Sequence, residues 1–586
     1  MTKKKNYSDW SKEELIDEVN ALIKQKTYGL VWEKDKSKEV FDYYINWDGI
    51  KNKEAFPDTE GKFPVLKEVK GKEITTDSKN GEYNLLIEGD NYHSLAVLNF
   101  THNRAIDVIY IDPPYNTGHS DFRYNDRWVD EEDGYRHSKW LSFMEKRLKL
   151  AKKLLKDTGV IFISIDDNEV AQLSLLCDEL FNEKNVELYV WNVVDDTEGA
   201  MPKTAQHTVR KEHEYLIACF KDKRKIKFNK YSEFSYVDMD EWENADNDRR
   251  GDWMSGNISR GENGNPGKNY FEIKTPKGNK YLRNWAISED EYKKLLEDGR
   301  IYFSKNGTGV PRKKIFKNEQ QLVTQSSIFS GLKSSISGKN IIIEMLGECE
   351  FQHPKPVELI KRLIKISSDN DSIILDFFAG TGTTGHATMQ LNQEDKGKRT
   401  FILCTNNEVS DKKERELGEK GIKKGSEEYE KEGICQKICY PRLEKAINGY
   451  NTPDSIKVNG LGGNLKYFKN DFVDAISTDK NKKRIVDKSA AMICIKENAF
   501  EEVKDHGDDY KIFKNHSLNL GIIFNEESID DFVKVAKDIK GKFHIYVFSL
   551  DDTVPEHEFR ELKNRVTLCA IPEAILHVYR QVFKYG

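Results

Sequence analysis

The chain has 586 residues, of which 37% are hydrophobic and 33% charged, and its formal net charge is −6 at pH 7. No apolar run approaches the ~18 residues of a membrane-spanning helix, and the first residues lack the apolar core of a secretory signal, so we expect a cytoplasmic protein. The negative charge argues against a protein coated in nucleic acid, and the length predicts roughly three to five compact units.

Residues 1–80 begin with a helix signal and continue as a loop-rich stretch. Ser8 is a candidate N-cap, and the sequence Ser11-Lys12-Glu13-Glu14 forms a capping box. The apolar residues that follow have helical spacing. They are Leu15, Val19, Leu22 and Ile23. We therefore expect an N-terminal helical and loop region over 1–80.

From Asn84 strand and helix patterns alternate. Apolar runs predict strands at 84–90, 105–114, 159–167 and 214–220, and helices at 93–100 and 137–156. Apolar strands separated by helices indicate a mostly parallel sheet that is covered on both faces. Residues 81–220 are therefore predicted to form one half of an α/β domain.

The stretch Asp112-Pro113-Pro114-Tyr115 ends the strand predicted at 105–114. The exocyclic amine of a nucleobase is a poor nucleophile because its lone pair is delocalised into the ring. The Asp112 carboxylate and the Pro113 carbonyl can each accept one amine hydrogen, Pro114 stiffens the turn, and Tyr115 can stack on the base. Such a base must first leave the duplex. An ordinary strand-ending turn is the alternative for this stretch taken alone.

Residues 221–345 lose the alternation and are rich in glycine, asparagine, lysine and aromatic residues. So long a stretch favours a separate recognition module over a surface insertion. Two basic runs interleave with aromatic residues, which favours a nucleic-acid surface over an ordinary solvated face. The candidates for DNA contacts in these runs are Lys223, Arg224, Lys225, Arg312, Lys313 and Lys314.

The alternation returns with a helix at 356–368, a strand, glycine turn and helix over 372–391, and a strand at 400–408. Glycines at 380, 382 and 385 permit a tight turn and let a ligand approach the backbone at the carboxyl end of a strand. This G-x-G-x-x-G spacing suits NAD or S-adenosylmethionine, and Glu408 can accept hydrogen bonds from the ribose of either. The D-P-P-Y stretch favours S-adenosylmethionine, because hydride transfer needs no such group.

Residues 446–586 predict a smaller α/β region, with strands at 490–496, 520–524 and 543–550, and carry no motif of known chemistry. The eight cysteines are scattered, and only Cys435 and Cys439 lie close together. We therefore expect no metal site and no disulfide framework.

The motifs resemble those of the amino-methylating DNA methyltransferases of the permuted (β) group, and most closely the modification (Mod) subunits of type III restriction-modification systems. The resemblance is carried by LLIEGDNYHSLAVLNF, IDVIYIDPPYNTGHSDFRYND, HSKWLSFMEKRLKLAKKLLKDTGVIFISIDDNE, HEYLIACF, GRIYFSKNGTGVPRKK, HPKPVELIKRLI and ILDFFAGTGTTGHA. It implies a Rossmann-like class I methyltransferase fold with a mostly parallel sheet. The D-P-P-Y half would occupy 81–220, the target-recognition domain 221–345 and the cofactor half 346–445, with smaller regions at 1–80 and 446–586.

The resemblance also implies roles for individual residues. Asp112, Pro113, Pro114 and Tyr115 would form the transfer site. Residues of the second half and of one early strand end would bind S-adenosylmethionine. These are Asp376, Phe378, Gly380 and Gly382 in the turn, Glu408 at the ribose, Asp90 at the adenine end, and Lys355 and Pro356 at the helix beside the cofactor. For Asp90 and Lys355, an ordinary turn or cap residue is the alternative.

The implied function is site-specific methylation of the N6 amine of a flipped-out adenine in double-stranded DNA, since in this group D-P-P-Y tends to accompany adenine. A cytosine-N4 methyltransferase and a DNA-recognition subunit that serves a partner nuclease are the alternatives. A separate restriction subunit and a homodimer are the implied partners. The implied setting is the cytoplasm of a bacterium, with the gene on its chromosome or on a phage.

Overall fold

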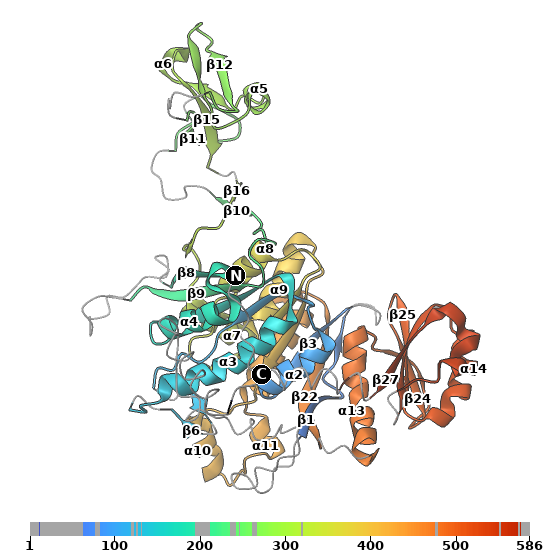
Figure 1. The fold of residues 1–586 in the computed structure, drawn as a ribbon. Helices are drawn as coiled ribbons and strands as arrows, with labels where there is room; N and C mark the ends of the chain where they lie inside the picture. Colours follow the sequence, from blue (N-terminus) through green and yellow to red (C-terminus); the bar gives the residue numbers. More distant parts are fainter. Residues whose placement is uncertain are drawn as a thin grey trace. The chain divides into compact units, whose positions relative to one another are not determined.

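The computed structural model describes residues 11, 62–76, 82–118, 122–124, 127–129, 132–193, 211–234, 242–244, 246–260, 266–317, 320–474, 479–549, 553–571 and 575. The helix predicted near Ser8 lies outside the described residues, apart from Ser11. The chain forms two compact units (Figure 1). Unit 1 comprises 1–227 and 326–586, and unit 2 comprises 228–325. In the described part of the chain, no helix is long and apolar enough to span a membrane.

A mostly parallel sheet forms the centre of unit 1, as predicted. Its central strands lie in the order β3 (Tyr83–Glu88), β19 (Thr400–Thr405), β18 (Ile373–Asp376), β4 (Ile106–Ile111) and β7 (Leu155–Ile165). These five strands are parallel to one another. β9 (His213–Phe220) follows antiparallel to β7 and to β8 (Val186–Asn192). The predicted Rossmann-like class I fold is therefore confirmed.

Helices cover both faces of this sheet because its strands are apolar on both sides. On one face, Ile109 and Ile111 belong to a buried cluster with α2 (Asn91–Thr101), α3 (Arg136–Leu154) and α4 (Val170–Phe181). On the other face, Phe401 and Leu403 lie so near Gly385 of α9 (Thr383–Asp395) that a Cβ atom there would be 3.1 Å from each, and α9 packs against α8 (Val357–Ser367). The helices predicted at 93–100, 137–156 and 356–368 are confirmed.

Strands from the terminal regions extend the central sheet. β22 (Asn464–Asp474) lies parallel to β3, and both β1 (Lys62–Glu68) and β2 (Ile74–Thr75) pair antiparallel with β22. At the opposite edge, β17 (Ile328–Phe329) lies parallel to β8. Strands of the predicted regions 1–80 and 446–586 are thus part of the central sheet.

The rest of the C-terminal region is a five-stranded sheet with two helices. In order, its strands are β23 (Glu501–Asp505), β24 (Tyr510–Lys514), β25 (Leu518–Ile523), β26 (Lys542–Phe548) and β27 (Val566–Ile571), with α14 (Ile529–Asp538) packed beside them. β25 and β26 confirm the strands predicted at 520–524 and 543–550. The strand predicted at 490–496 is wrong, because these residues belong to α13 (Asp479–Glu497). A short apolar run fits a buried helix as well as a strand, and periodicity alone does not separate them.

Unit 2 has its own small core, formed by Ile258, Ile273, Trp285, Tyr292 and Ile301. A three-stranded sheet contains β11 (Trp253–Asn257), β15 (Pro311–Phe316) and β14 (Ile301–Phe303). Beside it lie the hairpin β12 (Tyr270–Lys274) and β13 (Lys280–Asn284), α5 (Glu289–Glu297), and the pair β10 (Tyr231–Phe234) and β16 (Gln320–Val323). Both borders of unit 2 fall inside the predicted range 221–345, since α7 (Ser335–Leu346) belongs to unit 1.

The remaining elements are short. They are β5 (Arg123–Tyr124), β6 (Arg127–Trp128), η3 (Glu183–Asn185), α6 (Ser304–Gly307), α10 (Asp411–Glu419), α11 (Glu427–Glu430), η5 (Cys435–Cys439), α12 (Tyr440–Asn448), β20 (Gly449–Asn451), β21 (Lys457–Asn459), η6 (Glu526–Ser528) and η7 (Glu556–Arg565).

Candidate active site

The D-P-P-Y stretch and the glycine turn meet at one edge of the central sheet. β18 and β4 are neighbouring parallel strands, with Leu375 beside Ile109. Asp376 ends β18 and Asp112 directly follows β4, so both carboxyl groups lie at the carboxyl edge of these strands. The fold thus brings the two motifs together, although the whole of unit 2 separates them in the chain.

The turn at 112–115, called the transfer turn below, contains two prolines whose carbonyl groups differ in their contacts. The indole Nε1 of the fully buried Trp140, in α3, donates a hydrogen bond to the Pro114 carbonyl oxygen at 2.7 Å. Among the described residues, none donates a hydrogen bond to the Pro113 carbonyl oxygen. The turn is therefore anchored through Pro114, while the Pro113 carbonyl keeps its capacity to accept a hydrogen from a ligand.

A buried carboxylate holds the residue that follows the turn. Asn116 has a left-handed φ of 56° and no exposed surface, and its side-chain amide donates to Glu169 Oε1 at 2.5 Å. His137, at the start of α3, also contacts Glu169 Oε1, at 2.6 Å. Asparagine tolerates this conformation better than most residues do. Glu169 and His137 therefore fix the chain where it leaves the transfer site.

Three polar side chains converge beside Asp112, and two of them come from distant segments. The Tyr115 hydroxyl lies 3.0 Å from Asp112 Oδ1 and 2.9 Å from Glu214 Oε2. The Lys355 ammonium lies 2.7 Å from the Tyr115 hydroxyl, 3.0 Å from Asp112 Oδ1 and 3.2 Å from Glu214 Oε2. Glu214 enters from the start of β9, which runs antiparallel and so begins at the carboxyl edge of β7. Lys355 therefore lies in the predicted transfer site, not only beside the helix that it precedes.

Burial and charge act in opposite directions in this cluster. Burial, helped by the neighbouring Glu214 carboxylate, raises the pKa of Asp112 despite the lowering effect of Lys355. Burial lowers the pKa of Lys355, but the charges of Asp112 and Glu214 outweigh it, so that this pKa is raised. The Lys355 side chain is only 7% exposed and stays a cation at neutral pH.

The glycine turn after β18 is built around Asp376. Its Oδ1 accepts a hydrogen bond from the Phe378 amide at 2.9 Å, and its Oδ2 accepts one from the Thr384 hydroxyl at 2.5 Å. Gly380 and Gly382 have φ values of 49° and 78°, the left-handed region that glycine adopts without strain. Asp376 therefore ties the strand end to the first turn of α9, as the predicted ligand-binding turn requires.

The Asp376 carboxyl group is almost completely buried, with 3% of the residue exposed. Burial raises its pKa to about 7, and the charge of Asp112 acts in the same direction. The two motifs are thus coupled electrostatically as well as by strand pairing.

A buried arginine donates hydrogen bonds to the glycine turn. Arg442, in α12, is fully buried and donates to the carbonyl oxygen and hydroxyl of Thr381 and to the hydroxyl of Thr383. Burial lowers its pKa to about 10. No carboxylate in the described part of the chain forms an ion pair with Arg442. Its guanidinium therefore binds backbone and hydroxyl groups of the glycine turn.

The other predicted cofactor residues lie around the same edge. Asp90 is the N-cap of α2, where its Oδ1 accepts from the Tyr92 amide at 2.7 Å, so the capping alternative is confirmed. The exposed Glu408 follows β19 and accepts from the Asn406 side chain at 3.4 Å. Pro356 is the N-cap residue of α8. Asp90 and Glu408 follow the neighbouring parallel strands β3 and β19, and the contacts of all three residues with a ligand stay predictions.

The first basic run predicted to contact DNA lies in unit 1. Lys223, Arg224 and Lys225 come after Phe220, the last residue of β9. Because β9 is antiparallel to β7, they lie at the edge of the sheet opposite to Asp112. Each is ion-paired with an acidic residue. The partners are, in order, Glu187, Asp222 and Asp157. This position, outside unit 2 and away from the transfer site, counts against their predicted role in DNA contact.

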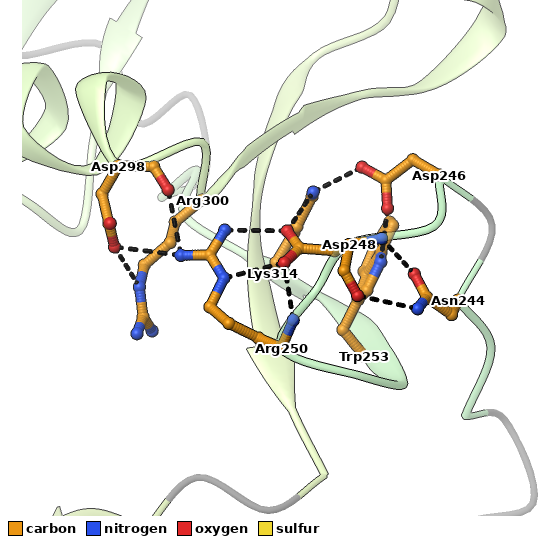
Figure 2. Close-up of polar contacts among 8 residues, drawn as sticks. All are labelled: Asn244, Asp246, Asp248, Arg250, Trp253, Asp298, Arg300 and Lys314. Carbon is orange, nitrogen blue, oxygen red and sulfur yellow. Dashed lines mark hydrogen bonds and ion pairs between the residues drawn. The ribbon is translucent and has the colours of Figure 1, made fainter.

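The second basic run lies in β15 of unit 2, and Figure 2 shows the surroundings of Lys314. Lys314 is only 5% exposed, and its ammonium pairs with Asp246 and, at 2.9 Å, with Asp248. A buried ammonium bound by two carboxylates is not available to a DNA phosphate, so Lys314 has a structural role and the prediction for it is corrected. Arg312 is exposed and Lys313 is half-buried, and their DNA contacts stay predictions.

The same network continues through Arg250. Hydrogen bonds from Arg250 and Lys314 hold the pKa of Asp248 well below its usual range. Arg250 also donates to the carboxylate of Asp298 at 3.1 Å, and Arg300 donates to that carboxylate at 2.6 Å (Figure 2). These contacts fasten the loop before β11 to the turn before β14 and so stiffen unit 2.

Sequence reasoning missed several residues of the site, namely Trp140, Glu169, Glu214 and Arg442. Glu214 lies in the HEYLIACF stretch that carries part of the resemblance, so its place at the start of a strand was available as a signal. Trp140 and Glu169 lie in the stretch 137–169, which also carries part of the resemblance, whereas no motif marks Arg442. In the described segments, no cluster of three or more histidine, cysteine, aspartate or glutamate side chains is arranged to hold a metal ion.

Comparison with known proteins gives consistent relatives. Residues 106–409 match the N6_N4_Mtase family, described as DNA methylase. The chain is 37% identical over 353 residues to the type III restriction-modification enzyme StyLTI Mod subunit of Salmonella typhimurium, a match covering 56% of this chain and 53% of the relative. It is 29% identical over 456 residues to the EcoPI Mod subunit of Escherichia phage P1, covering 68% of each. The type II methyltransferase M.KpnI of Klebsiella pneumoniae is 31% identical over 340 residues, covering 54% of this chain and 79% of the relative.

The chain therefore spans about half the length of the StyLTI Mod subunit and about two thirds of the EcoPI Mod subunit. The family match covers more than half of the 586 residues and includes both strand ends of the site. The chain belongs to the N6_N4_Mtase family of DNA methylases.

Proposed function

We propose that the chain transfers a methyl group from S-adenosylmethionine to the N6 amine of an adenine in double-stranded DNA. The observation that carries this proposal is the position of the Asp112 carboxylate and the Pro113 carbonyl beside the glycine turn of β18. The two acceptors suit an amine with two hydrogens, and the turn suits an adenosyl cofactor. The relatives named as Mod subunits support the same assignment.

The residues of the cofactor edge fit S-adenosylmethionine. A Cβ atom at Gly380 would lie 3.7 Å from the Phe351 ring, an ordinary van der Waals distance, so the turn leaves room for about one carbon atom beside this glycine. Gly380 and Gly382 would present backbone to the ligand, and the exposed Glu408 would accept hydrogen bonds from the ribose hydroxyls. When bound, the cofactor supplies an electrophilic methyl group on a sulfonium sulfur.

The residues of the transfer turn would direct the target amine. Asp112 and the Pro113 carbonyl would each accept one hydrogen, which turns the nitrogen lone pair out of the plane of the base. Tyr115 would stack on the extruded base. The amine held in this way would direct its lone pair at the methyl group that the cofactor supplies, and the methylated nitrogen would release one proton to water.

We further propose that unit 2 provides the sequence recognition. Its exposed cations, such as Arg312 and Lys313, would contact phosphates, and other side chains would contact base edges in the groove. A restriction subunit is the expected partner, because the relatives are named as subunits of type III restriction-modification enzymes. A homodimer in the cytoplasm is the expected state, by resemblance to the same group.

The test is to incubate the purified chain with DNA and methyl-labelled S-adenosylmethionine, digest the DNA to nucleosides and separate them by mass. We expect N6-methyladenine in the wild-type reaction and none with Asp112→Ala. N4-methylcytosine instead would assign the chain to the other amine. Specific DNA binding without any methylated nucleoside would favour a recognition subunit that serves a nuclease. Sequencing that detects methylated bases, on DNA from a host expressing the chain, would also return the target site.

A further inference from the structure

We propose that Lys355 and Glu214 are a positioning pair that holds the Asp112 carboxylate for the incoming amine. Neither residue needs to touch the methyl donor or the methyl group in this role. The inference rests on the proposed function, since it assigns these two residues to the amine side of the same site. It replaces the expectation that Lys355 serves the cofactor.

The Lys355 ammonium has three hydrogens and three oxygen neighbours. These oxygens belong to Asp112, Tyr115 and Glu214, at 3.0, 2.7 and 3.2 Å. An ammonium has three donors and no acceptor, so this arrangement uses its full capacity. With 7% of its side chain exposed, Lys355 has little surface left for a ligand. Its geometry therefore points to the neighbouring side chains and not to a cofactor.

The contacts divide the two oxygens of the Asp112 carboxylate. Oδ1 is bound by the Lys355 ammonium and by the Tyr115 hydroxyl, both at 3.0 Å. No described residue donates a hydrogen bond to Oδ2. A carboxylate fixed through one oxygen has its other oxygen in a set direction, which is what acceptance of an amine hydrogen requires. Lys355 therefore orients Asp112 as well as balancing its charge.

Glu214 completes this arrangement from β9. Its Oε2 accepts from the Tyr115 hydroxyl at 2.9 Å and lies 3.2 Å from the Lys355 ammonium. Without Glu214, the ammonium would have lost one of its three partners and could shift toward Asp112. Without Lys355, two carboxylates would share a buried site with no cation between them, and one would take up a proton.

Five titratable groups on five segments surround Asp112. They are Tyr110 in β4, Tyr115 in the turn, Glu214 in β9, Lys355 before α8 and Asp376 in β18. Lys355 is the one cation in this set, and its effect on the pKa of Asp112 opposes that of Glu214. Removing Lys355 therefore raises the pKa of Asp112, whereas removing the charge of Glu214 lowers it.

The experiment compares the full-length wild type with Lys355→Met, Glu214→Gln and the double variant. The rate of methyl transfer to DNA is measured in single turnovers across pH, and S-adenosylmethionine binding is measured separately by calorimetry. Lys361→Met is the matched control. Lys361 lies in α8, is paired with Glu394 at 2.7 Å, and takes no part in the site.

We expect the acidic limb of the rate profile to move to higher pH in Lys355→Met and to lower pH in Glu214→Gln, because ionised Asp112 is the active form. The double variant should lie between the two. The maximal rate of Lys355→Met should fall about 100-fold, as loss of orientation typically costs, while cofactor affinity stays within about threefold. Lys361→Met should match the wild type.

Loss of S-adenosylmethionine binding in Lys355→Met would overturn the proposal and return Lys355 to the cofactor. Shifts of the same sign in the two single variants would overturn it as well. A wild-type protein that methylates no DNA would instead refute the proposed function. In that case the titration of Asp112 is followed by thermal unfolding. Each variant is measured across pH with and without the additional substitution Asp112→Asn, and the difference between the two melting temperatures reports the protonation of Asp112. Opposite shifts are then still expected, and equal ones would overturn the positioning role.

Discussion

The indole of Trp140 donates its one N–H hydrogen to the carbonyl oxygen of Pro114 at 2.7 Å, and the Trp140 side chain is fully buried. This contact satisfies one of two consecutive proline carbonyls and leaves the other, that of Pro113, for a ligand. A tryptophan in the long helix α3 thus decides which backbone oxygen of the transfer turn remains open.

Replacing the indole tests this anchoring. Trp140→Phe keeps most of the ring volume but leaves the Pro114 carbonyl without its donor, which typically costs about 1–3 kcal/mol of unfolding free energy. We expect methyl transfer to slow by about tenfold or more, because the turn loses its fixed geometry. Urea unfolding and single-turnover rates measure the two effects. S-adenosylmethionine affinity is the internal control, and a variant with the wild-type transfer rate would contradict the anchoring role.

Asp112 should be essential for transfer but not for cofactor binding. Asp112→Ala removes the acceptor for the amine and leaves the β18 turn unchanged. We expect no detectable methylated nucleoside, together with S-adenosylmethionine affinity close to that of the wild type. Methylation by Asp112→Ala at the wild-type rate would refute the mechanism. Asp112→Asn keeps one acceptor oxygen and should retain more activity than the alanine variant.

Asp376 should make the ligand-free protein less stable as pH rises. Its pKa of about 7 in the folded state lies above the ordinary value of about 3.9, so the folded state keeps its proton over a range where the unfolded state loses it. The free energy of unfolding should therefore fall between about pH 4 and 7, by roughly 4 kcal/mol from this group, and then level off.

Asp376→Asn removes this titration and keeps both hydrogen bonds, since its carbonyl can accept from the Phe378 amide and its amide can donate to Thr384. The melting temperature of the variant relative to that of the wild type should rise with pH up to about pH 7. Parallel curves for the two proteins would show that Asp376 does not titrate in this range.

Arg442 should affect the cofactor turn more than the fold. Arg442→Met removes the donors to Thr381 and Thr383 but also removes the cost of burying an unpaired charge, so the net change in stability should be small. We expect S-adenosylmethionine affinity to fall about tenfold, because the residues that contact the ligand lose the hydrogen bonds that orient them. Calorimetry and thermal unfolding separate the two effects. Unchanged affinity with a large loss of stability would contradict this assignment.

Neighbouring cations of β15 should behave differently. Arg312→Gln should weaken DNA binding on all sequences and lower the salt dependence by about one phosphate contact. Lys314→Gln should leave the salt dependence unchanged, because its ammonium is bound to Asp246 and Asp248, and should destabilise unit 2. Binding is measured at several salt concentrations, and unfolding of unit 2 by urea. A reduced salt slope in Lys314→Gln would contradict its structural role.

The sequence was sufficient to predict the central sheet because its strands are continuous apolar runs bounded by glycine or acid. It was also sufficient to place Asp112 and Asp376 at the ends of two strands, and the carboxyl ends of neighbouring parallel strands meet at one edge of a sheet. It did not place Lys355 at Asp112, since this contact depends on how β9 and the segment before α8 pack in three dimensions. It misassigned 490–496, where an apolar run forms the buried side of α13.

The basic residues show a different limit. In a run such as Arg312-Lys313-Lys314, the exposed Arg312 and the buried Lys314 are two residues apart and lie on the same face of the strand, so strand alternation does not separate them. The acidic partners of Lys314 lie far from it in sequence, and no local pattern predicts the pairing. Charge runs therefore located a strand of unit 2 without telling which of its cations remain free.

Unit 2 begins and ends in strands that pair with each other, β10 with β16. Its two ends are therefore fixed beside one another by its own hydrogen bonds, and its insertion costs the host sheet little loop-closure entropy. A segment with these properties can be exchanged as a cassette during evolution or in the laboratory. Replacement of 228–325 by the corresponding segment of a relative would then keep the methyl-transfer site of this chain and change the DNA sequence that it recognises.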